Sequence, residues 1–418
     1  MEKSGKFRLT SLERNWILYD VGNSAFVLMV ATLIPIFFNA LAEAGGLSSV
    51  EYLAYWGYAS SAVTVITAVL SPILGTVADT KGFKKPIFIL CVFVGIVGCC
   101  AMGAASAWLP FLVIFVIAKV GFSGSLVFYD SMLSDVTTPE RMDEVSSRGY
   151  AWGYIGSCVP FVVCLGLVLG AGSIGISQMT ALNLALLLTA AWWLLTTLPL
   201  LKSYKQLHYV EVEKHAVRQS FARIGHTLRH LPEDKQVFWF LLAFFCYIDG
   251  VYTIIDMATA YGTALGLDTT GLLLALLVTQ IVAFPSALIF GRLSNKYPSA
   301  KLIPVCIAAY AGIAVFAFFM TTQRQFWVMA VIVGMFQGGV QALSRSHFAK
   351  IIPPEKSGEY FGLFDICGKG ASFLGTMIVS VGSQLTGSAN VGVGSLIVLF
   401  IVGFVLFRVS CKKEVVPE

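Results

Sequence analysis

Four ionisable residues lie well inside long apolar runs of this 418-residue chain, and their types indicate what chemistry it could perform. They are Lys119, Asp249, Asp365 and Lys369. A charged side chain at the centre of a membrane-spanning helix costs roughly 2.5–3.5 kcal/mol on insertion scales, so such residues usually face a partner or a wet cavity. The chemistry open to them is the binding of charged solutes and the carrying of protons across a membrane.

Lys119 and Asp249 are the main candidates for these two tasks. Lys119 has no neighbouring carboxylate on its own run, so its partner must come from another segment or from a carboxylate or phosphate group of a solute. Asp249 could exchange a proton, because burial favours the neutral form of a carboxyl group and a nearby lysine favours the charged form. The alternative for Asp249 is a structural hydrogen bond to a neighbouring helix.

The other two of these four residues, together with Asp20 and Asn23, could act with Lys119 and Asp249. Asp365 and Lys369 stand four positions apart and can meet on one face of a helix, either as a self-neutralised structural pair or as part of the site. Asp20 lies about one turn inside the first run, with Asn23 on the same face. Asp20 could therefore contact a solute, or hold the start of its helix or a cytoplasmic gate.

Two glutamines and one pair of opposite charges complete the set. Gln280 and Gln337 lie near the middle of their runs and could orient a ligand, although glutamines at this depth also join helices to one another. Asp130 and Arg345 stand 215 positions apart at similar depth in two different runs. We expect Asp130 and Arg345 to form a gate pair on the cytoplasmic side.

Twelve apolar runs must position these residues. Apolar residues make up 57% of the chain and charged residues 12%, compared with about 25% charged residues in a soluble domain. A helix needs about 20 apolar residues to span the hydrocarbon core, and the runs are of that length. We expect helices near 16–42, 52–78, 87–106, 108–134, 149–171, 177–201, 236–262, 269–292, 302–321, 326–348, 360–383 and 391–408.

The basic residues predict how these helices are oriented. Of the 28 Lys and Arg residues, all but three fall in every second loop or at the two ends of the chain. The exceptions are Arg324, in a loop of the other set, and Lys119 and Lys369 inside runs. Since basic loops stay in the cytoplasm during insertion, we expect a multi-pass protein of the plasma membrane with both termini cytoplasmic.

The two halves of the chain share sequence landmarks. The segment 75–85 after the second run recurs in weaker form at 291–301 after the eighth. This repeat predicts an all-α integral membrane protein with two pseudo-symmetric six-helix bundles, 1–201 and 236–418, joined by a cytoplasmic linker at 202–235. In such duplicated folds the solute site lies between the two halves.

The loop after the second run resembles the signature of the major facilitator superfamily, G-x-x-x-D-[RK]-x-G-[RK]-[RK]. Its positions are matched by Gly75, Asp79, Gly82 and Lys84, whereas Thr80 and Phe83 stand where the signature prefers basic residues. A carboxylate is favoured at the N-terminus of a helix, where free N–H groups point outward. The resemblance implies that Asp79 binds the helix beginning near 357–359 and latches the two halves together when the cavity faces outward.

Two short motifs narrow the resemblance. The segments Asn15-Trp16-x-x-Tyr19-Asp20-x-x-Asn23 and Tyr247-x-Asp249-Gly250-Val251 are similar to those of the branch that contains the yeast vacuolar amino-acid effluxers. This resemblance implies small solutes, with amino acids as one candidate class, and favours efflux over uptake.

The leading interpretation is a secondary active transporter that works by alternating access in the lipid bilayer and couples a small-molecule substrate to protons or sodium. We expect the protein to be a monomer. We also expect that it is not an enzyme and has no cofactor, metal or nucleic-acid partner, because the chain lacks a P-loop, a Cys-x-x-Cys pair and a clustered basic surface. Two alternatives stay open: an exporter of lipids, amphiphiles or drugs on the same fold, and a non-transporting receptor or scaffold.

Overall fold

The computed structural model of this chain describes residues 7–211, 225–227 and 229–411, together with most of their side chains. Within these ranges all regular secondary structure is helical, apart from one isolated β-bridge between Thr80 and Val210. The expected linker 202–235 therefore lies partly outside the described residues. The side chain of Lys369 also lies outside the description, so the predicted Asp365–Lys369 pair stays a prediction.

The first half of the chain supplies six membrane-spanning elements. Their bounds are α1 (Ser11–Ala31) with α2 (Leu33–Ala44), α3 (Ser49–Ala78), α4 (Lys84–Gly103), α5 (Trp108–Ser131), α7 (Met142–Leu169) and α8 (Gln178–Ser203), and a short α6 (Leu133–Val136) follows α5. The second half supplies α10 (Lys235–Asp256) with α11 (Ala258–Ala264), α12 (Thr269–Leu293), α13 (Ser299–Phe318), α14 (Gln323–Ile351), α15 (Ser357–Thr386) and α16 (Ala389–Gly394) with α17 (Ile397–Ser410). Two single turns, η1 (Leu231–Glu233) and η2 (Pro354–Lys356), precede α10 and α15.

The twelve-helix prediction is confirmed. Eleven of these elements are long and apolar enough to cross a membrane, and α15, with 30 residues, is the twelfth. Where the structure departs from the expected bounds, the helices mostly extend beyond the apolar runs. Thus α7 begins at Met142 rather than near 149, and α14 ends at Ile351 rather than near 348. The reason is that hydropathy detects the part of a helix inside the hydrocarbon, whereas the backbone stays helical into the polar zone.

Several helices begin where the sequence provides an N-terminal cap. Thr10, Ser48 and Thr322 each accept a hydrogen bond from the backbone N–H three residues later, and the glutamate or glutamine there bonds back to the cap. This reciprocal capping satisfies two of the free N–H groups at a helix start. It fixes where α1, α3 and α14 begin, and so sets the depth of the residues further along each helix.

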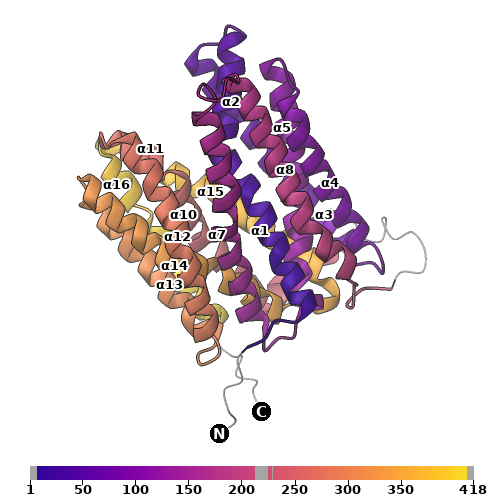
Figure 1. Cartoon of the computed structure of the whole chain (residues 1–418). Coiled ribbons are helices and arrows are strands. Elements are labelled where there is room, and N and C mark those ends of the chain that lie inside the picture. The colour runs from indigo at the N-terminus through magenta and orange to yellow at the C-terminus, as the bar shows by residue number, and fades with distance from the viewer. Residues whose placement is uncertain (1–6, 212–224, 228, 412–418) are drawn as a thin grey trace, which may run out of the picture.

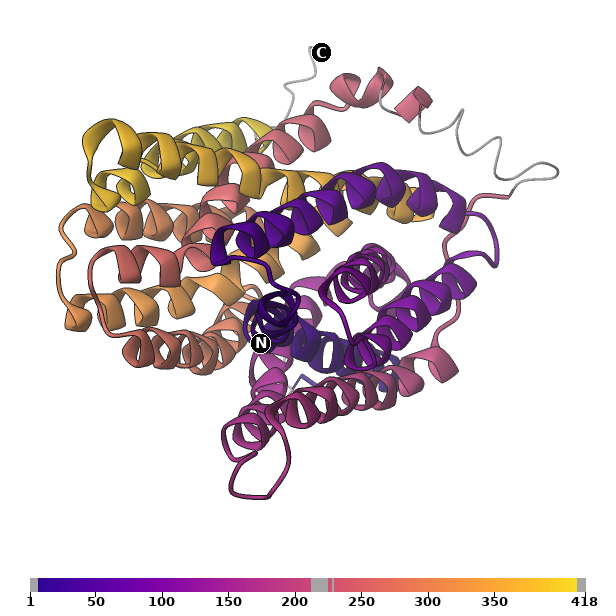
Figure 2. The ribbon, with the colours of Figure 1, turned by 90° about the horizontal axis from the view of Figure 1, so that it is seen from above.

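The two halves are close together at one end of the molecule and lean apart at the other. Figure 1 shows that the start of α1 and the last turns of α17 lie at the closed end, and Figure 2 shows the halves side by side from above. Across the boundary between them, α7 packs against α12 and α14, and α3 packs against α15. These five helices hold the residues that close one end of the molecule.

Candidate functional site: a polar cavity between the two halves

A cavity of about 350 Å³ lies between the two halves of the molecule. Its walls come from α1, α5 and α7 on one side and from α10, α12, α14 and α15 on the other. The volume is in the range of sites that hold small organic molecules. The cavity is lined by seven of the residues that the sequence singles out: Asp20, Asn23, Asp130, Gln280, Gln337, Arg345 and Asp365.

Arg345 on α14 joins the two halves at the closed end of the cavity. Its side chain is only 2% exposed and forms an ion pair with Asp130 on α5, with 3.0 Å between Nη1 and Oδ1. It also donates to the hydroxyl of Ser146 on α7 at 2.9 Å and to the backbone carbonyl of that residue at 3.0 Å. The rings of Trp16 and Tyr150 lie 4.7 and 4.3 Å from the guanidinium carbon. The structure thus brings the predicted pair Asp130 and Arg345 together.

Asp20 belongs to the same cluster. Its Oδ2 lies 3.6 Å from Nη1 of Arg345, so that one guanidinium serves two carboxylates of the opposite half. Gly149 makes room for this arrangement, because a Cβ there would lie 2.8 Å from Oδ2 of Asp20 and 3.0 Å from Nη2 of Arg345. The side chain of Asn23 donates to the backbone carbonyl of Tyr19 one turn earlier at 3.0 Å. The sequence predicts Asp130 as the partner of Arg345, and it gives a cytoplasmic gate as one possible role of Asp20 without naming Arg345 as its partner.

The signature loop lies at the same closed end and contacts the start of α15. Asp79 accepts hydrogen bonds from the backbone N–H groups of Gly358 at 2.7 Å and Glu359 at 2.8 Å. Gly75 permits this approach, since a Cβ at that position would lie 2.1 Å from the carbonyl oxygen of Gly358. The structure therefore shows the contact that the family resemblance implies between the loop and α15. We keep its role as a conformational latch as a proposal.

Two more residues of the loop have defined partners. The ammonium group of Lys84, which is fully buried, lies 3.5 Å from Asp79 and 2.8 Å from the hydroxyl of Ser357. Gly82 adopts a φ of +79°, a backbone conformation that suits glycine. Its N–H donates to the side chain of Gln206 at 3.0 Å. The loop is thus held both by the opposite half and by the segment after α8.

That segment, residues 204–211, makes a contact that the sequence does not predict. Asp135 accepts a hydrogen bond from the hydroxyl of Tyr204 at 2.5 Å and from the backbone N–H of His208 at 2.9 Å. Burial and the Asp135 carboxylate raise the pKa of Tyr204 above its ordinary value, so its hydroxyl keeps the proton that it donates. Asp135 also lies 4.0 Å from Lys84. The start of the linker is therefore connected to the latch loop through the buried carboxylate of Asp135 as well as through Gln206.

The first turns of α7 add further contacts between the halves. Asp143 forms an ion pair with Lys350 at 2.6 Å and accepts a hydrogen bond from the hydroxyl of Ser346 at 2.6 Å. Glu144 accepts one from the side chain of Asn295 at 2.9 Å. The sequence analysis places 142–148 in a loop and so misses these contacts. Two adjacent acids opposite the basic end of α14 are the signal that could have indicated them.

Lys119 lies outside the cavity lining. Its ammonium group lies 4.7 Å from the ring centre of Phe122 and 5.9 Å from that of Phe26, which are cation–π distances. It also acts electrostatically on Asp256, a cavity residue on α10 in the other half. Lys119 is therefore placed to influence charge in the cavity rather than to contact a solute there.

Asp249 is fully buried and also lies outside the cavity lining. Its two carboxylate oxygens accept from the backbone N–H of Gly375 at 2.9 and 2.8 Å, and one of them accepts from the hydroxyl of Thr253 at 3.2 Å. Gly375 has no room for a side chain, because a Cβ there would lie 2.6 Å from Oδ1 of Asp249. This geometry matches the structural alternative for Asp249, a hydrogen bond that joins α10 to α15.

Replacing Asp249 with alanine should lower the free energy of unfolding by about 1–3 kcal/mol, because the N–H of Gly375 would lose its buried acceptor. Thermal unfolding of the purified full-length protein in detergent measures the change. Asp256→Ala on the same helix is the matched control, since the side chain of Asp256 is exposed to the cavity and should contribute little to stability. Equal stability of the two variants would contradict the structural role of Asp249.

The remaining predicted residues lie on the cavity walls. Asp365 accepts a hydrogen bond from the hydroxyl of Ser71 on α3 at 2.7 Å, a further link between the halves. Gln280 is half-buried, and Gln337 is buried with 5% of its surface exposed. One turn beyond Gln337, Gln341 accepts a hydrogen bond from the hydroxyl of Tyr154 in the opposite half. The sequence offers no sign of this last partner.

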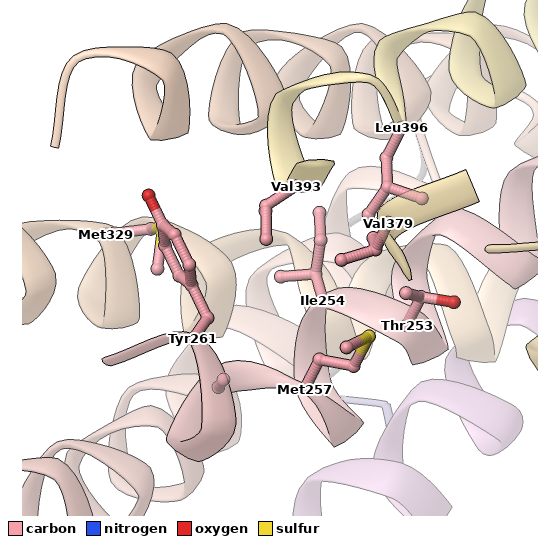
Figure 3. A pocket seen from close by; sticks show the side chains of 9 residues that line it. Thr253, Ile254, Met257, Tyr261, Met329, Val379, Val393 and Leu396 are labelled. Carbon is pink, nitrogen blue, oxygen red and sulfur yellow. The ribbon is translucent and has the colours of Figure 1, made fainter. Parts of the chain in front are cut away.

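A second pocket, shown in Figure 3, is too small to hold a solute. Its volume is about 10 Å³, which is at the lower limit for one water molecule. Apolar side chains of the second half line it, among them Ile254, Met257 and Val379. We interpret it as a packing gap, and the cavity between the halves stays the candidate site.

Comparison with known proteins agrees with this architecture. Residues 47–414 match the family model described as "Vacuole effluxer Atg22 like". The chain is 42% identical over 404 residues to the "Uncharacterized MFS-type transporter YxiO" of Bacillus subtilis, covering 96% of this chain and 94% of that one. It is 26% identical over 308 residues to autophagy-related protein 22 of Cryptococcus neoformans, which covers 68% of this chain and 52% of that one.

Solved structures with the same fold come from distant relatives. The human organic anion transporter MFSD10 superposes with a TM-score of 0.73 at 14% identity, over 95% of this chain and 98% of that chain. FucP, a major facilitator superfamily transporter solved in the outward conformation, superposes with a TM-score of 0.71 at 16% identity, over 96% and 98% of the two chains. At these identities the likeness shows the fold alone.

Proposed function

Because this chain belongs to the family described as "Vacuole effluxer Atg22 like", whose members share the major facilitator fold, we propose that it exports a small solute by proton-coupled alternating access. That it is a multi-pass membrane transporter of this superfamily, and not an enzyme, follows from the family itself. The substrate, the direction and the coupling ion are our proposal, with amino acids as the first candidate class.

One observation carries the proposal. A solute-sized cavity, whose lining mixes apolar side chains with four aspartates and several amide and hydroxyl groups, lies between two six-helix halves. Contacts between the halves close one end, and the halves lean apart at the other. Such a cavity is what a carrier needs in order to expose one site alternately to the two sides of a membrane. If the basic loops are cytoplasmic, as their distribution predicts, the closed end faces the cytoplasm and this is the outward-facing state. We also propose that the protein lies in the plasma membrane and that it works as a monomer.

The carboxylates around Arg345 support coupling to protons. Asp20 and Asp130 share one guanidinium, so a proton taken up by either would weaken its hold on Arg345 and loosen the closed end. Asp365 lines the same cavity, whereas Asp249 and Lys119 do not. We therefore place the proton step at Asp20 and Asp130 and keep Asp249 as the buried alternative.

Flux into proteoliposomes tests the proposal. A panel of amino acids and other small solutes is compared with and without an imposed proton gradient, using wild type, Asp130→Asn, Asp249→Asn and Lys119→Ala. We expect gradient-driven flux that Asp130→Asn uncouples and that Lys119→Ala alters only in part. If Asp249→Asn abolished proton coupling while Asp130→Asn left it intact, the proton site would be Asp249 instead. Absence of flux for every solute would refute the proposal.

Two alternative functions are less well supported. An exporter of lipids, amphiphiles or drugs is favoured by an apolar cavity that opens sideways, whereas the lining here includes four aspartates and several amide and hydroxyl groups. A receptor or scaffold has no need of a cavity between the halves. The polar cavity therefore favours a carrier of small polar solutes.

A further inference from the structure

The cavity between the halves exposes negative charge and buries its positive charge. Among the described side chains, its lining contains four aspartates and one basic residue, Arg345. The side chain of Arg345 is 2% exposed, that of Asp130 is 20% exposed, and Asp256 is exposed. We propose that this cavity selects solutes with a positively charged head that donates hydrogen bonds, such as organic amines. The inference rests on the transport function proposed above, and it puts organic amines ahead of amino acids as the substrate class of that site.

Arg345 is not open to the carboxylate or phosphate of an anionic solute. Its guanidinium already binds Asp130 and Ser146, and aromatic rings lie within 5 Å of the guanidinium carbon, Tyr150 at 4.3 Å and Trp16 at 4.7 Å. The only other basic group near the cavity in the described part of the chain, Lys119, acts electrostatically on Asp256 but is not in the lining and so offers no direct contact. An anion entering the cavity would therefore meet carboxylates without an accessible counter-charge, which is unfavourable in a region of low dielectric constant.

Asp256 is the carboxylate that an entering cation can reach most readily. It lies at the end of α10, towards the side where the halves lean apart, and makes no hydrogen bond or ion pair with any described residue. Tyr252 lies one turn earlier on the same face and also lines the cavity. A carboxylate beside an aromatic ring is a suitable site for an ammonium group, which can form an ion pair with the carboxylate and a cation–π contact with the ring.

Deeper in the cavity, two buried acceptors have no hydrogen-bond donor among the described residues. They are Oε1 of Gln337, a residue that is 5% exposed, and Oδ2 of Asp20, a residue that is 6% exposed and whose contact with Arg345 is an ion pair at 3.6 Å rather than a hydrogen bond. A buried acceptor without a donor is unfavourable, and an ammonium group offers three donors and no acceptor. The two residues come from opposite halves and both line the cavity, so a cationic head would find acceptor groups on each side.

A series of three aromatic compounds that differ only in charge tests the inference. Tyramine carries a positive charge, tyrosine is zwitterionic, and 3-(4-hydroxyphenyl)propionate carries a negative charge. Binding of each to the purified full-length protein is measured from the concentration at which it raises the unfolding temperature. We expect tyramine to act at a concentration about tenfold lower than tyrosine, because loss of a charge-assisted hydrogen bond weakens binding by at least that factor. The propionate should need a still higher concentration than tyrosine.

Two charge-neutralising variants make the test specific. Asp256→Asn should remove most of the preference for tyramine without changing the unfolding temperature of the free protein, because the side chain is exposed. Asp268→Asn is the matched control: Asp268 is an exposed cap of α12 that accepts from Gly271, asparagine can also cap a helix, and the residue does not line the cavity. Asp268→Asn should keep the full preference.

Three results would overturn the inference: binding of the propionate as tightly as tyramine, an unchanged preference in Asp256→Asn, or binding of none of the three compounds. The flux panel described above then decides separately on the transport function. Gradient-driven flux of neutral or anionic solutes would retain the carrier and reject the cationic preference. Loss of binding together with absence of flux for every solute would reject both.

Discussion

Arg345→Ala is expected to lower the free energy of unfolding by about 3–5 kcal/mol and to abolish transport, because removing one partner of a buried ion pair leaves uncompensated charge. Asp20 and Asp130 would then face each other without the guanidinium that neutralises both. Stability is measured by thermal unfolding in detergent, and transport by flux into proteoliposomes at matched protein content. The stability and flux of Arg345→Lys should lie between those of wild type and Arg345→Ala, since a lysine can hold one carboxylate but lacks the planar fork of arginine.

Two further variants separate the role of Arg345 in the gate from a general effect on folding. Arg324→Ala changes the same residue type on the same helix at an exposed position and should leave stability and flux unchanged. The double variant Asp130→Asn with Arg345→Gln removes charge from both partners and should recover most of the lost stability, while flux stays low. Wild-type flux in Arg345→Ala would contradict a gate at this position.

Asp79→Asn is expected to release the start of α15 from the signature loop. The carboxylate of Asp79 accepts two backbone hydrogen bonds, and an amide oxygen can replace only part of this interaction. A loss of about 3 kcal/mol would shift the balance between closed and open states about a hundredfold. Hydrogen–deuterium exchange measures this directly, since the amides of Gly358 and Glu359 should exchange faster by a comparable factor.

The control for this experiment is Asp234→Asn, an exposed carboxylate that caps the start of α10 by accepting from Val237. Like Asp79, Asp234 accepts a hydrogen bond from a backbone N–H at the start of a helix, but both residues of its contact belong to the same half. Exchange at the start of α15 should not change in this control. Unchanged exchange at Gly358 in Asp79→Asn would show that the loop contact does not hold the halves together.

The fold was predictable because the bilayer imposes a constraint that can be read along the chain. A membrane helix must satisfy its own backbone and present apolar side chains for about 20 residues, so runs of that length mark helices without knowledge of their neighbours. The family's signature spacing carried further information. Gly75 and Asp79 lie one turn apart at the end of α3, and that spacing lets the backbone approach while the carboxylate reaches the start of α15.

The candidate site was only partly predictable. Lys119 and Asp249 have the residue types and the depth expected of site residues, but neither lines the cavity. Depth along a helix follows from position in the sequence, whereas the direction in which a side chain points depends on how each helix rotates against its neighbours. Tyr154 and Ser146, which bond to α14 across the boundary between the halves, carried no signal for the same reason.

The sequence alone determined which residues lie in the membrane, their depth, the expected orientation of the chain and the composition of the signature loop, because each depends on local pattern or on charge counted along the chain. The tertiary structure decided which charges meet. It paired Arg345 with both Asp130 and Asp20, buried Asp249 against the backbone of α15, and left Asp256 exposed in the cavity. Those outcomes depend on distances between segments far apart in the chain, which only the packing of the two halves can set.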